Sequence, residues 1–427
     1  MAQIEPFQAY YYNPDKVPLE QVVTEPYDKI DKAAYERYSK RNSWTAAKLI
    51  LNPEWPVDAD IKGKYDQTNE LFQQWISDRI VVRIDKPSFY IYKQTFSYND
   101  KEYARIGLSV LCKTEPYENH VILPHEFTLS KPKLDRMEHL KTFKANFGHI
   151  FCLYSDKESV LFSHLKSYME RVPLFDFVDM DYSVRHQVWV IQEPDVIQKI
   201  QSFMRDKQLL IADGHHRYET ALQYAQDGGQ PYVMMTLLNL YDPGLVILPT
   251  HRALTNISDI NLLNIVDRLR DDFHIERLSL ESIHDRRMVM NRLIEAGKHS
   301  VSFGFYYGSN EFILLKYKKE AIPNTLFTEF KSATWRSLDV VILHKAILEN
   351  YFGINEDKLK KETHVTYIRQ YESAFDLVDR GGTPVVFFLN KTDVEKVFEV
   401  CKSGERMPQK STDFYPKLLT GLLIYKF

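Results

Sequence analysis

The chain has 427 residues, of which 44% are hydrophobic and 26% charged, a composition typical of a globular protein. The formal net charge is -3, so the composition gives no electrostatic argument for nucleic-acid binding. The three cysteines form no CxxC pair, which argues against a disulfide framework and a thiolate metal site. No basic leader and no long apolar run is present. We therefore expect a cytoplasmic protein without a membrane span, built from two or three domains.

Hydrophobic periodicity and turn residues predict a mixed α+β fold of the α/β class. In the first part of the chain the pattern predicts helices over 30–39, 58–78, 131–147, 194–205 and 214–226, and strands over 88–97, 102–113, 188–191 and 209–212. Asn99 and Asp100 provide the turn of a hairpin between residues 88 and 113.

After a strongly specified turn at Asp242-Pro243-Gly244, a strand is expected over 245–249. The pattern restarts near residue 255, which predicts an N-terminal α/β region over 1–254 and a C-terminal α+β domain over 255–427. In this domain we expect helices over 261–273 and 282–296, a third helix that ends near Gly404, a hairpin over 300–317, and strands over 384–390 and 421–424. Thr392 and Glu395 would form the capping box of the last helix.

The most informative segment is the junction at 211–222, where an apolar strand breaks into Asp213-Gly214-His215-His216-Arg217 and continues as a helix. Gly214 permits a sharp turn, and a helix start exposes unpaired N–H groups at the positive end of the helix dipole. Arg217 and two imidazoles add donors, so the sequence predicts a phosphate site. In the alternative, Asp213 simply caps the helix and Arg217 pairs with a carboxylate. Zinc is disfavoured, because adjacent histidines on a turn diverge.

Three further segments offer candidate site residues. Glu126 follows an apolar run and could act as a general base, although a solvated surface loop is an equal alternative. Residues 404–417 superficially resemble a P-loop, but Gln409 replaces the second glycine and two prolines interrupt the pattern. What remains is the Lys410–Lys417 loop, whose donors could contact a phosphate or simply close a domain. These donors are Lys410, Ser411, Thr412 and Lys417.

His251 and Arg252 follow a strand, at the position where open α/β sheets place ligands, and Asp28 is another contributor from the N-terminal segment. A cap or a salt bridge is the simpler role for each of them. The sequence contains no Rossmann GxGxxG, no GxSxG elbow and no kinase HRD or DFG set.

Together these motifs resemble the bacterial and archaeal family catalogued as domain of unknown function 1015, often labelled SpoOJ-regulator-like. The resemblance covers nearly the whole chain. Glu25, where a small residue or a second proline is expected, and Asp413, where an aromatic residue is commoner, depart from the family pattern. The matching segments are Pro6-Phe7, Glu25-Pro26-Tyr27-Asp28, Pro124-His125-Glu126, Arg185-His186-Gln187-Val188-Trp189, residues 211–222, Leu248-Pro249-Thr250-His251-Arg252 and Met407-Pro408-Gln409-Lys410-Ser411-Thr412.

Within this chain, residues 185–225 are similar to the core of the ParB and sulfiredoxin superfamily, whose free-serine kinases carry an Asp-Gly-His-Thr-Arg-like motif. Sulfiredoxin chemistry is disfavoured, because the turn has no nearby cysteine. The resemblance implies that five consecutive residues contact a phosphate or a metal-bound nucleotide, namely Asp213, Gly214, His215, His216 and Arg217.

We therefore expect a phosphotransferase that uses ATP or ADP with Mg²⁺ to phosphorylate a small hydroxyl metabolite, with free serine as one candidate. Asp213 could hold Mg²⁺ or the substrate hydroxyl, Glu126 would be the base, and Arg217, Lys410 and Arg252 would neutralise phosphate. Two alternatives remain: a nucleotide-binding regulator like ParB relatives, and a phosphatase or other hydrolase that uses His215 or His216. The sequence is also compatible with an oligomer.

Overall fold

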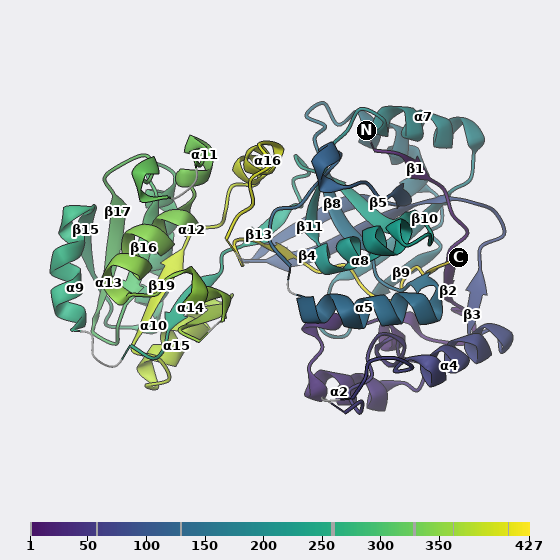
Figure 1. The fold of residues 1–427 in the computed structure, drawn as a ribbon, viewed down its shortest axis with the longest axis horizontal. Coiled ribbons are helices and arrows are strands. Elements are labelled where there is room, and N and C mark those ends of the chain that lie inside the picture. The colour runs from purple at the N-terminus through teal and green to yellow at the C-terminus, as the bar shows by residue number, and fades with distance from the viewer. Residues whose placement is uncertain are drawn as a thin grey trace. The chain divides into compact units, whose positions relative to one another are not determined.

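The computed structural model describes residues 2–56, 59–128, 130–257, 261–327, 330–361, 363–408 and 410–427. The chain divides into two compact units, and Figure 1 shows both termini in the first. The first unit comprises Met1–Pro124, Thr128–Val246 and Pro416–Phe427, and the second comprises His125–Phe127 and Ile247–Tyr415.

The division differs from the one expected from the sequence. It falls after residue 246 rather than 254, and the final segment 416–427 belongs to the first unit. This segment returns there because its backbone pairs with that unit: Tyr425 lies opposite Asn146, and Thr420 forms a bridge with Thr24. The predicted loop 410–417 is therefore divided between the units.

The first unit is built on a mixed sheet with the strand order β6-β11-β8-β12-β5-β4-β10-β9, and β1 pairs with β5. Most neighbouring strands are antiparallel, but β11 runs parallel to β6 and β12 parallel to β8. The strands of this unit are β1 Ile4–Glu5, β2 Tyr10–Tyr12, β3 Val81–Arg83, β4 Phe89–Tyr98, β5 Lys101–Lys113, β6 Ile122–Leu123, β7 Ala145–Asn146, β8 Ile150–Tyr154, β9 Phe175–Val178, β10 Arg185–Ile191, β11 Leu209–Asp213, β12 Tyr232–Asn239 and β21 Tyr425–Lys426.

Helices cover this sheet, and the longer ones have recognisable starts. Asp31 caps α2 by accepting from the Ala34 N–H, and Pro194 occupies the first turn of α7. Helix α8 packs on β12 and β8, and α5 packs against α8 (Figure 1). The helices are α1 Leu19–Val22, α2 Lys32–Arg41, α3 Ala47–Ile50, α4 Asp66–Ser77, α5 Ser130–Phe143, α6 Val160–Leu165, α7 Pro194–Met204 and α8 His215–Gln226.

The two faces of this sheet differ in polarity. One face carries an apolar core that includes Ile91, Leu108, Cys152 and Ile211. On the other face, Ser109 lies opposite Thr236, and their hydroxyls are 2.9 Å apart. The second face can therefore hold a buried polar layer.

The second unit is a three-layer α/β/α structure around a sheet ordered β15-β17-β16-β19-β14-β18, in which the strand pairs are antiparallel. One core packs α9 and α12 on the sheet, and another packs α10 and α15 on it. The elements are β13 Val246–Leu248, β14 His251–Leu254, β15 Phe273–Ser279, β16 Ser302–Tyr306, β17 Glu311–Tyr317, β18 Val365–Ile368, β19 Val385–Leu389, β20 Asp413–Tyr415, α9 Leu262–Arg268, α10 Ile283–Gly297, α11 Ala333–Arg336, α12 Asp339–Ile342, the π-helical turn Leu343–Glu349, α13 Asn350–Phe352, α14 Glu356–Lys360, α15 Tyr371–Asp379 and α16 Val394–Lys402.

The mixed α/β class is confirmed, as are the hairpins near 88–113 and 300–317. Asn99 and Asp100 both have positive φ angles, of 51° and 59°, as a two-residue hairpin turn requires. Within residues 185–225, strands β10 and β11 are not neighbours, because β8, β12, β5 and β4 lie between them in the sheet.

Four predicted element boundaries also need correction. The helix expected over 58–78 begins only at Asp66, after a left-handed Gly63, and its expected first residue lies outside the described part of the chain. The helix expected over 131–147 ends at Phe143, because Lys144 takes a positive φ of 47°. Helix α16 is capped by Asp393, not by Thr392, whose hydroxyl donates to the Ser411 carbonyl. The helix expected over 261–273 ends as α9 at residue 268.

The expected strand 421–424 is absent as a strand, although its residues are buried. Gly421 has a φ of +85°, which lies outside the range of a regular β-strand. A Cβ at this position would lie 2.8 Å from the Cβ of Ala46. The segment therefore bends where its apolar pattern predicted an extended strand.

We predict that Gly421→Ala lowers the free energy of unfolding by about 2–5 kcal/mol, from left-handed backbone strain together with overpacking. The matched control is Gly228→Ala, at a φ of +88° with nothing within 4 Å of the added Cβ. That variant should lose only about 1–2 kcal/mol. Urea denaturation of the full chain measures both, and equal losses would contradict the proposed contact with Ala46.

Candidate functional site

A β-bulge at the end of β11 places Asp213. Ile211 pairs with Cys152 of β8, but Asp213 pairs with Phe151, so two residues of β11 oppose one residue of β8. Without the bulge, Asp213 would share the apolar face of Ile211 and Cys152. With it, the carboxylate reaches the polar face of the sheet.

Gly214 forms the turn between β11 and α8. Its φ is +98°, and it is the N-cap residue of α8 without any side-chain capping bond. A Cβ here would lie 3.1 Å from Nε and Nη2 of Arg217. Glycine therefore serves two purposes, because it permits the left-handed turn and lets the guanidinium of Arg217 fold back across it.

Asp213 is the centre of an ion cluster at the start of α8. Arg217 Nη2 donates to its Oδ2 at 2.8 Å, and Lys417 Nζ donates to its Oδ1 at 3.1 Å. Arg217 Nη1 also donates to the carbonyl of His149 at 2.6 Å. The alternative interpretation of the motif is thus correct about the ion pair but wrong about the cap. Two cations therefore share one carboxylate.

The pKa of Asp213 is held well below its ordinary value. Burial alone would raise this pKa, but the charges of Lys417 and Arg217 and the hydrogen bond from Lys417 outweigh burial. The carboxylate therefore stays ionised at neutral pH. A group with so low a pKa is a poor general base.

His149 is a site residue that sequence reasoning missed. It is buried, its Nδ1 lies 2.8 Å from the Thr236 hydroxyl, and its Nε2 has no hydrogen-bond partner. Burial, and then the charge of Arg217, lower its pKa to about 3, so the ring is neutral at pH 7. The sequence pattern did not single out His149, because this residue stands just after the end of the expected helix 131–147.

The two histidines of the motif have different environments. His215 is buried and His216 half-buried, both in the first turn of α8. The five predicted residues 213–217 are consecutive, and Lys417 joins them through its contact with Asp213.

Of the remaining predicted residues, Asp28 is exposed in the first unit, and the others lie in the second unit. Glu126 is half-buried there. Arg252 is buried and donates to the carbonyls of Thr250 and Lys410, and burial lowers its pKa to about 10. His251 Nδ1 accepts from the Leu389 N–H at 3.2 Å.

The predicted loop residues of this unit are either exposed or close to a hydrogen-bonding partner in the same unit. Lys410 is exposed, and the Ser411 hydroxyl donates to the Pro408 carbonyl at 2.5 Å. The Thr412 hydroxyl lies 2.8 Å from His125 Nε2. Gln409, on which the P-loop comparison turned, lies outside the described residues.

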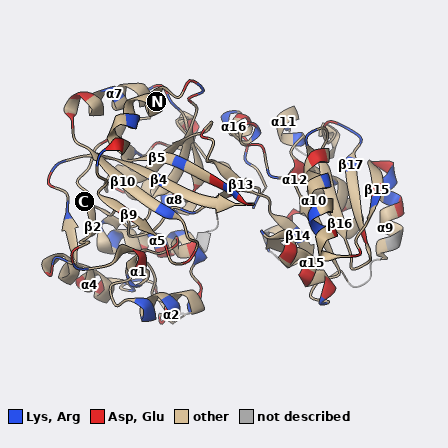
Figure 2. Ribbon diagram, turned by 180° about the vertical axis from the view of Figure 1, so that it is seen from behind, with Lys and Arg blue, Asp and Glu red and all other residues tan. Residues whose placement is uncertain are grey.

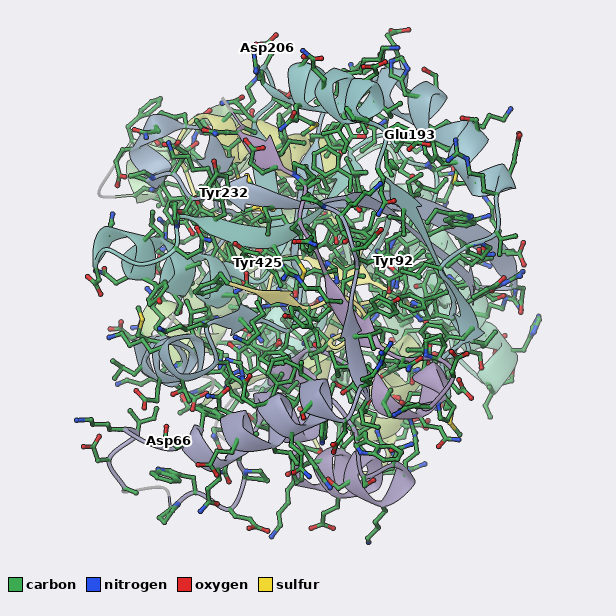
Figure 3. The ribbon with its side chains drawn as sticks, turned by 90° about the vertical axis from the view of Figure 1, so that its right-hand side faces the viewer. Asp66, Tyr92, Glu193, Asp206, Tyr232 and Tyr425 are labelled. Carbon is green, nitrogen blue, oxygen red and sulfur yellow. The ribbon has the colours of Figure 1, made fainter. Side chains whose placement is uncertain are left out.

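A second polar group lies on the same sheet face in the first unit. The Tyr92 hydroxyl is 2.7 Å from His186 Nδ1, and His186 Nε2 is 3.1 Å from Asp179. Tyr92 is only 2% exposed and lies inside the unit in Figure 3, where Asp206 lies at the outer edge. These buried side chains satisfy one another, which is a structural role.

Acidic and basic residues are interspersed along the helices of both units (Figure 2). Among the described residues, no group of three or more His, Cys, Asp or Glu could hold a metal ion. No helix in the described ranges has the length and apolar character that crossing a membrane requires.

The fold and the site define a two-unit α/β protein with a cationic cluster at a helix start. The chain belongs to the family described as protein of unknown function DUF1015, whose model matches residues 4–341. The family resemblance seen in the sequence is therefore confirmed. A comparison with curated proteins found no match.

Among solved structures, the chain is similar to a free serine kinase in complex with AMP, at 14% identity and a TM-score of 0.35, over 73% of this chain and 90% of that one. It is similar to a conserved hypothetical protein from Pyrococcus furiosus, at 14% identity and a TM-score of 0.33, over 73% and 94%. It also matches C-terminally truncated SbnI from Staphylococcus aureus, at 10% identity and a TM-score of 0.35, over 73% and 85%. These matches do not confirm the expected ParB-like core.

We predict that Asp213→Asn lowers the free energy of unfolding at pH 7 by about 3 kcal/mol, because two largely buried cations lose their partner. The folded-state pKa of Asp213 is lowered, so its contribution is complete above the unfolded pKa of about 3.9 and is lost as the pH falls through the folded value. The difference between wild type and variant should be constant from about pH 7 to 5 and narrow below about pH 4.

Urea denaturation over this pH range measures the difference. Asp206→Asn is the matched control, because Asp206 is exposed at the edge of the first unit (Figure 3) and should be neutral in stability. If Asp213→Asn were as stable as wild type at pH 7, the ion pairs of Asp213 would contribute nothing to the free energy of unfolding.

Proposed function

We propose that this protein is a nucleotide-dependent phosphotransferase for a small hydroxyl metabolite, and that it binds phosphate at the start of α8. The observation that carries the proposal is the double pairing of Asp213. Arg217 and Lys417 both contact this one carboxylate, so two cations lie together at the positive end of a helix dipole.

The local geometry supports an anion at this position. The N-cap residue of α8 is Gly214, which has no side chain to accept hydrogen bonds from the first N–H groups of the helix. The Nε of Arg217 is buried and has no hydrogen-bond partner. A phosphate oxygen near the guanidinium would supply the missing acceptor.

The chemistry of transfer would rest on positioning and charge neutralisation. Arg217 and Lys417 would neutralise the transferred group, and Asp213 would orient both cations. Glu126 remains our proposed base, and free serine remains a candidate acceptor. His215, His216, Arg252 and the donors of residues 410–412 are proposed as further contacts.

The described residues do not fit a preformed magnesium site. Both carboxylate oxygens of Asp213 are contacted by cations, and no acidic cluster lies around it among the described residues. A magnesium ion that enters with ATP or ADP would therefore be held mainly by the nucleotide phosphates.

The test is a phosphotransfer assay followed by ³¹P NMR, with ATP or ADP, with and without Mg²⁺, against a panel of hydroxyl metabolites that includes L-serine. We predict that Arg217→Ala and Lys417→Ala each lower kcat/KM by about 100-fold or more, since each removes a donor to the transferred phosphoryl group. The melting temperature of each variant should stay within a few degrees of wild type.

Arg205→Ala is the matched control, because this arginine is exposed at the end of α7. Its activity should equal that of wild type. Nucleotide hydrolysis without transfer to any acceptor would instead favour a regulator, and release of phosphate from phosphoserine without nucleotide would favour a hydrolase. Either result would overturn the proposal.

A further inference from the structure

A cavity of about 60 Å³ lies inside the first unit, bounded by α5, α8 and the strands β7 and β8. This volume is large enough to hold a small anionic group such as a carboxylate or a phosphate. Part of its wall is apolar, formed by residues such as Leu140 and Phe147.

Its polar wall is cationic. Arg136 of α5 and Arg217 of α8 both line the cavity, and Arg136 is only 6% exposed. The hydrogen bonds of Arg136 to Asp135, Tyr65 and the Ile50 carbonyl are made by Nε and Nη2. Within the described chain this leaves Nη1 available for a ligand.

The two arginines belong to clusters of the same kind. Asp135 is contacted by Arg136 and by Lys64, at 2.7 Å for the latter, just as Asp213 is contacted by Arg217 and Lys417. Each carboxylate therefore faces two cations. Cations in a poorly solvated site favour the entry of an anion.

Two buried polar atoms on cavity-lining residues lack a partner. They are the Oγ1 of Thr220, on a residue only 3% exposed, and the Nε of Arg217. A buried donor without an acceptor costs free energy, which a ligand oxygen would recover.

A glycine keeps the wall of the cavity open. Gly148 lines it, and a Cβ at this position would lie 3.2 Å from both Arg217 Nη1 and Thr420 Oγ1. Any side chain here would therefore crowd the two polar groups.

We propose that this cavity binds the anionic group, carboxylate or phosphate, of a small ligand, with Arg136 and Thr220 as its specific donors. The site goes beyond the proposed phosphotransferase activity and does not depend on it. Arg217 reaches both the cavity and the α8 ion cluster, whereas Lys417 belongs to the cluster and is not part of the cavity wall.

The experiment measures anion binding to the full chain without nucleotide, in phosphate-free buffer of low ionic strength. Sodium acetate and inorganic phosphate are titrated separately by calorimetry and by melting temperature, with sodium chloride at matched ionic strength as the blank. Saturable binding of acetate alone identifies a carboxylate site, and saturable binding of phosphate identifies a phosphate site. No saturable binding of either would overturn the inference.

Thr220→Val is the decisive variant. Its hydroxyl has no partner in the free protein, so its removal should leave the melting temperature unchanged or slightly raised. The Kd for the bound anion should rise about tenfold or more, the effect of losing one hydrogen bond to a charged group. Thr142→Val, on α5 and outside the cavity wall, is the matched control and should leave the Kd unchanged.

Arg136→Met should abolish anion binding. If the Arg136→Met variant does not fold, Thr220→Val decides the test. Lys417→Met separates the two anion sites. If Lys417→Met weakens anion binding while Thr220→Val does not, the anion binds at the start of α8 and the cavity inference is overturned. A failure of the phosphotransfer assay would not change the result of the anion titration, because the titration contains no nucleotide.

Discussion

The pairing of Asp213 with two cations is the interaction on which the candidate site depends. It joins three parts of the first unit: the bulged end of β11, the first turn of α8, and the final segment, whose Lys417 lies 204 positions further along the chain. The bulge turns the carboxylate to the polar face of the sheet, and Gly214 lets Arg217 fold back to it. The bulge and the glycine act together, because each of them brings one charged group to the other.

The charge of this cluster says more about function than about stability. A largely buried carboxylate with one well-placed cation would already be neutral, and buried ion pairs contribute little net stability over apolar packing. The Asp135 cluster, with Arg136 and Lys64, has the same composition, and Arg136 also lines the cavity. Two such clusters fit the proposed binding of an anionic ligand.

The sequence predicted local structure better than tertiary arrangement. The hairpin of β4 and β5 and the junction of β11 and α8 follow from alternation, helical periodicity and turn residues, all of which act within a few positions. The bulge, the separation of β10 from β11, and the return of 416–427 depend on pairing between distant segments, which periodicity does not encode. Periodicity likewise does not predict that Arg136 is buried. Its burial follows from contacts with Ile50 and Tyr65.

The division of the loop 410–417 changes how the site should be understood. Sequence reasoning treated Lys410 and Lys417 as one basic loop, but the first belongs to the second unit and the other to the first. Asp213, Arg217, Lys417 and His149 therefore form a self-contained cluster within one compact unit. The proposed anion binding would then depend on that unit alone. The proposed base, Glu126, would act in transfer and not in binding, so mutation can separate the two steps.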